Sequence, residues 1–120
     1  MTLKTYRELE VWQRSMDLVE AVYRLTNEFP AEEKFGLTSQ LRRAAVSIPA
    51  NIAEGYGRVH RGDYLRHLSI AKGSLMEVET HLIIAVRLKF ASREKVAESW
   101  RLSQQVGKML TRLIEALQKV

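Results

Sequence analysis

The 120-residue sequence has no cysteine, only two prolines and only six glycines. The absence of cysteine excludes disulfide bonds and thiolate chemistry, and it is compatible with a reducing compartment. So few prolines and glycines leave room for long helices. The longest apolar run, residues 82–86, is far shorter than the roughly 20 residues of a membrane-spanning helix, and the first ten residues have no apolar signal core. We therefore expect a cytoplasmic protein without a membrane partner.

Composition and charge indicate one soluble domain with a basic bias. Hydrophobic residues make up 46% and charged residues 28% of the chain, ordinary values for a globular protein. The length suits a single domain, residues 1–120, with a core of its own. Residues 1–41 contain five Lys/Arg and seven Asp/Glu, whereas residues 42–72 contain six and two, and residues 73–120 contain eight and five. This basic excess suits a polyanionic partner, although similar charge is common in proteins that bind none.

Apolar residues recur at three- and four-residue steps along most of the chain, which predicts an all-α protein. Four helices are expected, over residues 8–29, 37–55, 63–89 and 93–118. Short connections between helices of this length favour an up-down-up-down four-helix bundle. We expect Thr5 and Glu8 to form a capping box at the first helix, and Asp63 and Ser92 to cap the third and fourth.

The second predicted helix carries more apolar surface than one buried side requires. Its core-facing stripe comprises Leu37, Leu41, Ala45, Ile48 and Ile52. A further side carries the small apolar residues Val46, Ala50 and Ala53. A surface helix in a small monomer needs only one buried side, so the second side indicates a partner.

Pro49 lies in the middle of this helical pattern. Proline has no N–H and crowds the carbonyl four residues earlier, so it kinks a helix or ends it. Because the apolar spacing resumes at Ile52, we predict a kinked helix that continues to Gly55, with Gly55 or Gly57 as a left-handed stop. The alternative is a helix that ends at Ser47 and is followed by a loop.

The third predicted helix is apolar almost all round in its last two turns, a pattern typical of a buried element. A bundle of four short helices cannot bury every side of one member, so the surplus argues for contacts between copies of the chain. The alternative is an unusually apolar monomer surface. The predicted interface between copies comprises Val46, Ala50, Ala53, Met76, Ile83 and Ile84.

Signals for catalysis, metal binding or cofactor binding are thin. No glycine-rich nucleotide loop follows a strand, and the Glu-x-x-His pairs of a di-iron bundle do not occur. Asp63 and His67, four residues apart, are expected to form a surface ion pair. We therefore expect no enzymatic activity, no cofactor and no metal. An enzyme would need a deep pocket that holds Asn51 and Glu54.

Polar residues follow a line beside the predicted kink. This polar motif comprises Arg43, Ser47, Pro49, Asn51, Glu54 and Gly55. We favour a network in which Arg43, Asn51 and Glu54 satisfy the backbone carbonyl that Pro49 frees, because buried polar groups need hydrogen-bond partners. The alternatives are a cluster that binds a small ligand or lines a ring, and plain exposure to solvent.

Basic residues are densest around the predicted turn between the second and third helices, with Tyr56 and Tyr64 among them. Guanidinium groups pair with phosphates, and aromatic rings stack on unpaired bases. No helix-turn-helix, zinc-finger or RNA-recognition motif is present, so any binding is expected to be sequence-tolerant and salt-sensitive. The alternative is a solvated loop whose arginines keep the protein soluble. The nucleic-acid-binding candidates are Arg42, Arg43, Arg58, His60, Arg61, Arg66 and Lys72.

One long motif covers residues 40–55 and reads Gln-Leu-Arg-Arg-Ala-Ala-Val-Ser-Ile-Pro-Ala-Asn-Ile-Ala-Glu-Gly. Further segments accompany it: Leu-Glu-Val-Trp at 9–12, Phe-Pro at 29–30, and Ile-Ala-Lys-Gly-Ser-Leu at 70–75 with Glu77 and Glu79. Together these segments resemble the four-helix-bundle family named after the 23S rRNA intervening sequence, first recognised in inserts of bacterial 23S ribosomal RNA genes. The resemblance covers nearly the whole chain.

This resemblance implies a small bundle that assembles into a homo-oligomeric ring, usually of five subunits. It implies no settled biochemical activity. A related branch of the family serves as accessory protein to the reverse transcriptase of diversity-generating retroelements, where it binds nucleic acid and the polymerase. The partners that we expect are therefore further copies of the chain, RNA or DNA, and a reverse transcriptase or other protein.

The sequence as a whole predicts a non-enzymatic, homo-oligomeric bundle, pentameric by resemblance, that acts as a nucleic-acid-binding accessory protein. The alternative is a protein-interaction scaffold for a polymerase or another partner, without direct binding of nucleic acid. Both hypotheses share the same fold and the same assembly. They differ in whether the chain binds nucleic acid directly.

Overall fold

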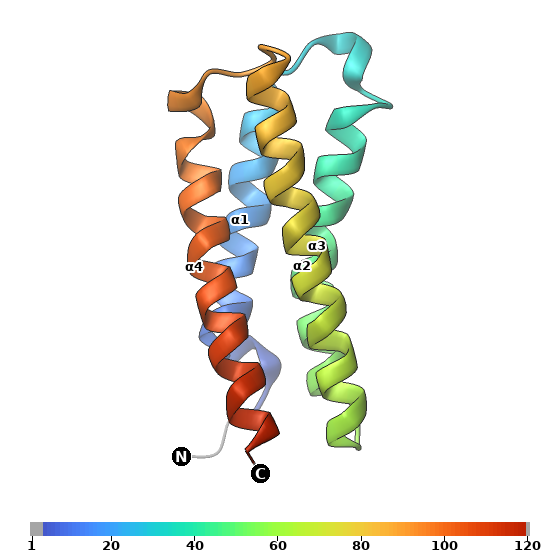
Figure 1. The fold of residues 1–120 in the computed structure, drawn as a ribbon. Helices are drawn as coiled ribbons and strands as arrows, with labels where there is room; N and C mark the ends of the chain where they lie inside the picture. Colours follow the sequence, from blue (N-terminus) through green and yellow to red (C-terminus); the bar gives the residue numbers. More distant parts are fainter. Residues whose placement is uncertain (1–3, 120) are drawn as a thin grey trace.

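The computed structural model describes residues 4–119 and contains four long helices (Figure 1). These helices are α1 (Glu10–Thr26), α2 (Leu37–Tyr56), α3 (Arg61–Arg87) and α4 (Arg93–Gln118). Two short 3₁₀ helices precede α1 and α2, namely η1 (Tyr6–Glu8) and η2 (Ala31–Glu33). The described residues contain no strand. The all-α class predicted from the apolar spacing is therefore confirmed.

The helices form an antiparallel four-helix bundle. Figure 1 shows α1 and α3 running in one direction and α2 and α4 in the other, so that α1 begins and α4 ends at the same end of the bundle. Each helix contacts two others: α1 and α3 both contact α2 and α4. Short connections bring consecutive helices side by side, which favours this arrangement.

One apolar stripe from each helix fills the interior of the bundle. The stripe predicted on α2 is buried, and Leu41, Ala45, Ile48 and Ile52 have no exposed surface. Burial of a side chain of valine or leucine size contributes about 1.5–3 kcal/mol to folding. The other three helices contribute Leu18, Val22, Leu68, Leu75, Val78, Leu82, Val106 and Leu110, which are also fully buried.

α2 continues through Pro49 to Tyr56. The alternative in which the helix ends at Ser47 is therefore wrong. The predicted left-handed stop is also wrong, because Gly55 is still helical and Gly57 has a right-handed φ of −77°. The N–H of Gly57 still makes a helical hydrogen bond to the carbonyl four residues earlier, so no reversal of the backbone is needed. The kink at Pro49 stays a prediction.

The predicted cap of α4 is confirmed, whereas the predicted cap of α3 is wrong. The Ser92 hydroxyl accepts a hydrogen bond from the N–H of Lys95 (3.2 Å) at the start of α4. Asp63 cannot cap α3, because that helix begins two residues earlier at Arg61 and Asp63 lies within its first turn. An acidic residue in this position is favourable for the helix dipole rather than for capping.

The capping box predicted at the first helix is also wrong. Thr5 accepts a hydrogen bond from the N–H of Arg7 (3.3 Å) and caps η1 only. The carboxylate of Glu8 accepts from the N–H of Lys4 (2.7 Å) instead of reaching back to Thr5. Thr5 and Glu8 therefore belong to the short η1 helix and its flank, and α1 begins separately at Glu10.

α3 ends in a left-handed residue that is not glycine. Lys89 has a φ of 63°, and the N–H of Phe90 donates to the carbonyl of Ala85 (2.9 Å) while that of Lys89 donates to the carbonyl of Val86 (3.0 Å). This pair of bonds is the Schellman pattern of a helix end. It turns the chain so that the ring of Phe90 lies 6.0 Å from that of Phe29, which covers this end of the core.

Candidate functional site

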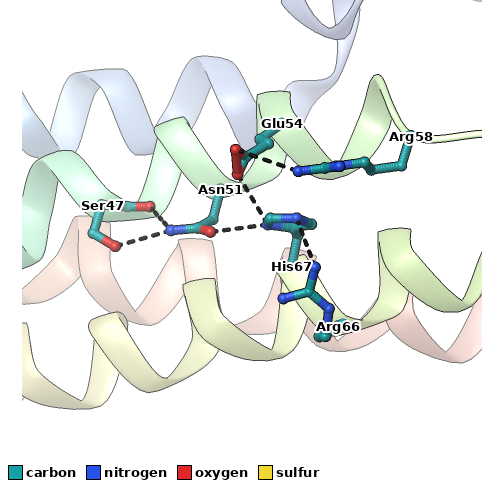
Figure 2. A network of polar contacts seen from close by, with 6 residues as sticks. All are labelled: Ser47, Asn51, Glu54, Arg58, Arg66 and His67. Carbon is teal, nitrogen blue, oxygen red and sulfur yellow. Dashed lines mark hydrogen bonds and ion pairs between the residues drawn. The ribbon is translucent and has the colours of Figure 1, made fainter.

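A chain of polar side chains joins α2 to α3 (Figure 2). The side-chain amide of Asn51 donates to the carbonyl (2.9 Å) and the Oγ (3.0 Å) of Ser47, one turn earlier on α2. Its Oδ1 therefore faces α3, where it lies 3.1 Å from the Nδ1 of His67. An oxygen of Glu54 lies 3.3 Å from the same ring nitrogen, and the other oxygen lies 3.7 Å from the guanidinium of Arg58.

The neighbours of His67 decide which nitrogen carries the hydrogen when the ring is neutral. Nδ1 faces the two acceptors from Asn51 and Glu54, so Nδ1 is the donor. Nε2 lies 3.4 Å from a guanidinium nitrogen of Arg66, which can only donate, so Nε2 is the acceptor. Both ring nitrogens thus have partners, although His67 is only 4% exposed.

Two more contacts hold α2 and α3 close together here. The hydroxyl of Ser74 on α3 donates to the Oγ of Ser47 (2.9 Å). Gly55 on α2 lies so near α3 that a Cβ atom at this position would be 2.8 Å from the Cβ of His67 and 3.2 Å from the carbonyl oxygen of Tyr64. We call this region the polar seam, defined as Ser47, Asn51, Glu54, Gly55, His67 and Ser74.

The polar motif predicted on α2 is only partly assembled as expected. Ser47, Asn51 and Glu54 belong to the network, but Arg43 does not: its side chain lines a hollow whose edge also includes Ser47. The carbonyl that Asn51 reaches belongs to Ser47, whereas Pro49 frees the carbonyl of the residue four positions before it. The network therefore joins α2 to α3, whereas the prediction was that it would satisfy the backbone carbonyl that Pro49 frees within α2.

His67 is the member of the network whose position the sequence analysis predicts wrongly. The predicted surface pair with Asp63 is wrong, because His67 is buried and its ring contacts α2. A signal for this arrangement does exist in the sequence. His67 and Ser74 are seven residues apart, so they share one side of α3, directly beside the apolar stripe that contains Leu68 and Leu75.

The seven predicted nucleic-acid-binding residues do not form one surface. Four of them, which we call the turn cluster, lie around the α2–α3 connection and are all exposed: Arg58, His60, Arg61 and Arg66. Arg42 and Arg43 lie in the first half of α2, roughly 20 Å away along the helix axis. Lys72 lines a separate hollow between α3 and α4. The structure thus divides the basic candidates into three groups.

Acidic and aromatic neighbours moderate the turn cluster. Glu54 lies 3.7 Å from Arg58, and Asp63 lies in the first turn of α3. Tyr56 and Tyr64 pack edge to face with ring centroids 6.1 Å apart. Burial, and secondarily the nearby Tyr56, raises the pKa of Tyr64 from 10.0 to about 12. The ring of Tyr64 is therefore packed within the bundle and is poorly placed to stack on a base.

The six predicted interface residues lie on different surfaces. On α2, Val46 and Ala50 are exposed and Ala53 is partly exposed, all on one side of the helix. On α3, Met76 and Ile83 are each 45% exposed and line hollows between α3 and α4. Ile84 is instead partly buried against the core. A single chain therefore leaves apolar side chains uncovered on two of its helices.

Three hollows on the described surface lie away from the polar seam or touch only its edge. One lies beside the first half of α2, and two lie between α3 and α4. Asn51 and Glu54 line none of these three. Within residues 4–119, no three histidine or acidic side chains gather into a group that could hold a metal ion. None of the described helices has an apolar stretch of the length that crossing a bilayer requires.

Comparisons with known proteins agree with this fold and with the resemblance carried by residues 40–55. The family model described as 23S rRNA-intervening sequence protein matches residues 7–112. A crystal structure of a protein with unknown function from the S23 ribosomal protein family of Bacteroides thetaiotaomicron is similar, with 28% identity over 87% of this chain and 97% of that chain and a TM-score of 0.80. No protein with a curated description gives a significant match. Because the family model spans most of its length, the chain belongs to the 23S rRNA-intervening sequence protein family.

Proposed function

We propose that this chain is a non-enzymatic, homo-oligomeric accessory protein that binds RNA or DNA through its turn cluster, without reading the base sequence. The observation that supports this best is the exposure of Arg58, His60, Arg61 and Arg66 at one end of the bundle. The side chains of His60 and Arg61 make no hydrogen bond or ion pair with another described residue. Their donors are free for phosphate oxygens, which arginine binds in two parallel hydrogen bonds.

Two residues of the polar seam contact arginines of the turn cluster. Arg58 lies 3.7 Å from Glu54, and a guanidinium nitrogen of Arg66 lies 3.4 Å from the Nε2 of His67. These contacts bias the two guanidinium groups towards the α2–α3 connection, although the carboxylate of Glu54 also competes with a phosphate for Arg58. We therefore assign the polar seam a supporting role: it aligns the two helices that carry the turn cluster and does not itself contact the ligand.

Assembly is the second part of the proposal. Val46, Met76 and Ile83 are each more than 40% exposed, at 42%, 45% and 45%. Apolar side chains on two helices of one small bundle favour a second copy as their cover. A ring, with five subunits by family resemblance, would repeat the turn cluster around its axis and would multiply the positive field that attracts a polyanion.

Fluorescence anisotropy with a labelled oligonucleotide of mixed sequence tests the binding. We expect binding at low salt that weakens as salt rises. Each neutralised phosphate makes the slope of log affinity against log salt more negative by about 0.7–0.9. The variant Arg58→Gln/Arg61→Gln should reduce both affinity and slope. The matched control Arg101→Gln/Arg112→Gln removes two exposed arginines from α4 and should change both less. Absence of binding at low salt, or equal losses in the two variants, would remove the proposal.

A protein-interaction scaffold is the second candidate, and one hollow favours it. Trp100 and Ile83, which are 36% and 45% exposed, line a hollow of about 580 Å³ between α3 and α4 together with Arg87 and Arg93. Tryptophan and arginine are enriched among residues that dominate protein–protein binding. A co-expressed reverse transcriptase should then be retained by the tagged chain and lost from Trp100→Ala. A chain that binds oligonucleotide but retains no polymerase would exclude this candidate.

A further inference from the structure

A second basic surface lies on the first half of α2, far from the turn cluster. It is an open hollow of about 570 Å³, bordered by α2, by Tyr23 on α1 and by the end of the loop that contains η2. We call it the Phe35 hollow. Its lining includes Tyr23, Lys34, Phe35, Arg42 and Arg43, and it extends to Val46, one of the predicted subunit contacts, and to Ser47 at the edge of the polar seam.

The lining of the Phe35 hollow contains three basic side chains and no acidic one. Glu33 in the adjoining loop is engaged elsewhere, because its carboxylate accepts a hydrogen bond from the N–H of Leu37 (3.0 Å). The turn cluster differs in this respect, since Glu54 and Asp63 lie within it or beside it. An anion in the hollow would therefore meet positive charge without a competing carboxylate in the lining.

Arg42 is held in place by the bundle. Its Nε donates to the Oγ1 of Thr26 (2.7 Å) and an Nη donates to the Oδ1 of Asn27 (3.0 Å), while its guanidinium carbon lies 4.4 Å from the centre of the Tyr23 ring. Arg42 thus contributes a fixed positive charge to the floor of the hollow. Arg43 beside it is exposed, and its side chain makes no ion pair or hydrogen bond with another described residue.

Phe35 adds an exposed aromatic ring to the basic side chains of the hollow. The residue is 88% exposed, so almost none of its apolar ring is covered by the chain itself. Lys34 lies next to it with its Nζ 5.5 Å from the ring centre. An exposed aromatic face next to cations is the arrangement with which proteins hold unpaired bases, because every base can stack on it while the cations contact the phosphates.

We infer that the Phe35 hollow binds one nucleotide unit, with the base stacked on Phe35 and the phosphate paired with Arg43 and Lys34. Every nucleotide combines a phosphate for the cations with a flat base for the ring, whereas an acidic peptide has a flat partner only if its sequence happens to supply one, so the combination favours a nucleotide. The unit can be a free nucleotide or one residue of a single strand. The single-strand case deepens the proposed function, on which it rests, because it adds a site for a base to the phosphate contacts of the turn cluster.

The test uses the full chain, adenosine monophosphate and a labelled single-stranded oligonucleotide. Phe35→Ala should weaken binding by roughly fivefold to a hundredfold, which is the effect of losing one base–aromatic stack. Phe35→Tyr keeps the ring and should retain the affinity. Arg43→Gln should weaken binding and lower its salt dependence. The matched control is Leu88→Ala, which trims a 57% exposed apolar residue at the end of α3, outside both the Phe35 hollow and the turn cluster.

The outcomes separate this inference from the proposed function. If Phe35→Ala weakens monophosphate and oligonucleotide alike, the hollow takes either source; if it weakens only one of them, that one is the ligand. If Arg58→Gln/Arg61→Gln lowers oligonucleotide affinity and Phe35→Ala changes nothing, the inference is overturned while the proposed function stands. If Phe35→Ala changes only the mass of the assembly, Phe35 is a subunit contact and the inference is overturned. If neither probe binds at low salt, both are overturned.

Discussion

The Nδ1 of His67 lies 3.1 Å from the Oδ1 of Asn51, across the boundary between α3 and α2. This contact is the centre of the polar seam, because Asn51 uses its amide hydrogens on Ser47 and only its oxygen can reach the other helix. A partly buried network in which both ring nitrogens of the buried His67 have partners favours one register between two helices over others. The seam therefore favours one alignment of α2 with α3 close to the connection that carries the turn cluster.

Asn51→Ala should destabilise the chain by about 1–3 kcal/mol, because it leaves the buried ring of His67 with one partner fewer and removes two hydrogen bonds to Ser47. Urea denaturation followed by circular dichroism measures the change in the free energy of unfolding. Gln40→Ala, which truncates an exposed amide on the same helix, should change it by less than about 0.5 kcal/mol. Equal effects of the two substitutions would mean that the contact with His67 adds no stability.

Gly55→Ala should destabilise the chain by about 1–3 kcal/mol, the usual range for overpacking. The added Cβ would meet the Cβ of His67 at 2.8 Å, and neither backbone can move without disturbing the seam. Gly73→Ala is the matched control, because a Cβ there meets nothing within 4 Å. Since alanine is the better helix former, Gly73→Ala should stabilise by up to about 1 kcal/mol. The two melting temperatures should thus move in opposite directions; a rise in both would contradict the close approach of α2 and α3.

Tyr64 should make the fold sensitive to alkali. Its pKa is about 12 in the folded chain against 10.0 for an ordinary tyrosine, so between these values the unfolded chain loses a proton that the folded chain keeps. Stability should therefore be unaffected by Tyr64 below pH 10 and should fall as the pH rises from 10 towards 12. Tyr64→Phe lacks this contribution. The difference in unfolding free energy between the wild type and Tyr64→Phe should decrease over this pH range, and a constant difference would contradict the raised pKa.

Ala50→Glu should break the assembly and leave a folded helical chain. Ala50 is exposed in the single chain, so the carboxylate meets water in a monomer but would lose it in a packed contact between copies. Light scattering after gel filtration measures the mass, and circular dichroism checks the fold. Gln40→Glu places the same charge on another side of α2 and should leave the mass unchanged. An unchanged mass for Ala50→Glu would count against this side of α2 as the contact.

The fold was predictable because its signals lie within single helices. Ile48 and Ile52 are four residues apart, and this spacing is enough to place both on the buried side of α2 without knowledge of its neighbours. The prediction from local sequence failed at the start of the first helix. Thr5 and Glu8 suit a capping box, but a short 3₁₀ helix forms there with other partners.

The polar seam was not predictable in the same way, because its members meet only when α3 folds back on α2. Asn51 and His67 are 16 residues apart in the sequence, and no spacing rule within one helix tells which side chains face each other across two. The division of the basic residues has the same origin. Arg43 and Arg58 look close in the sequence, but each helical residue adds 1.5 Å, so they end on separate surfaces.

Sedimentation velocity of the full chain mixed with a labelled oligonucleotide tests both halves of the proposed function in one experiment. We expect the protein to sediment as an oligomer of the 13.8 kDa chain, with the label moving in the same boundary at low salt and leaving it as salt rises. A 13.8 kDa species at every concentration, with the label sedimenting as free oligonucleotide, would contradict the account.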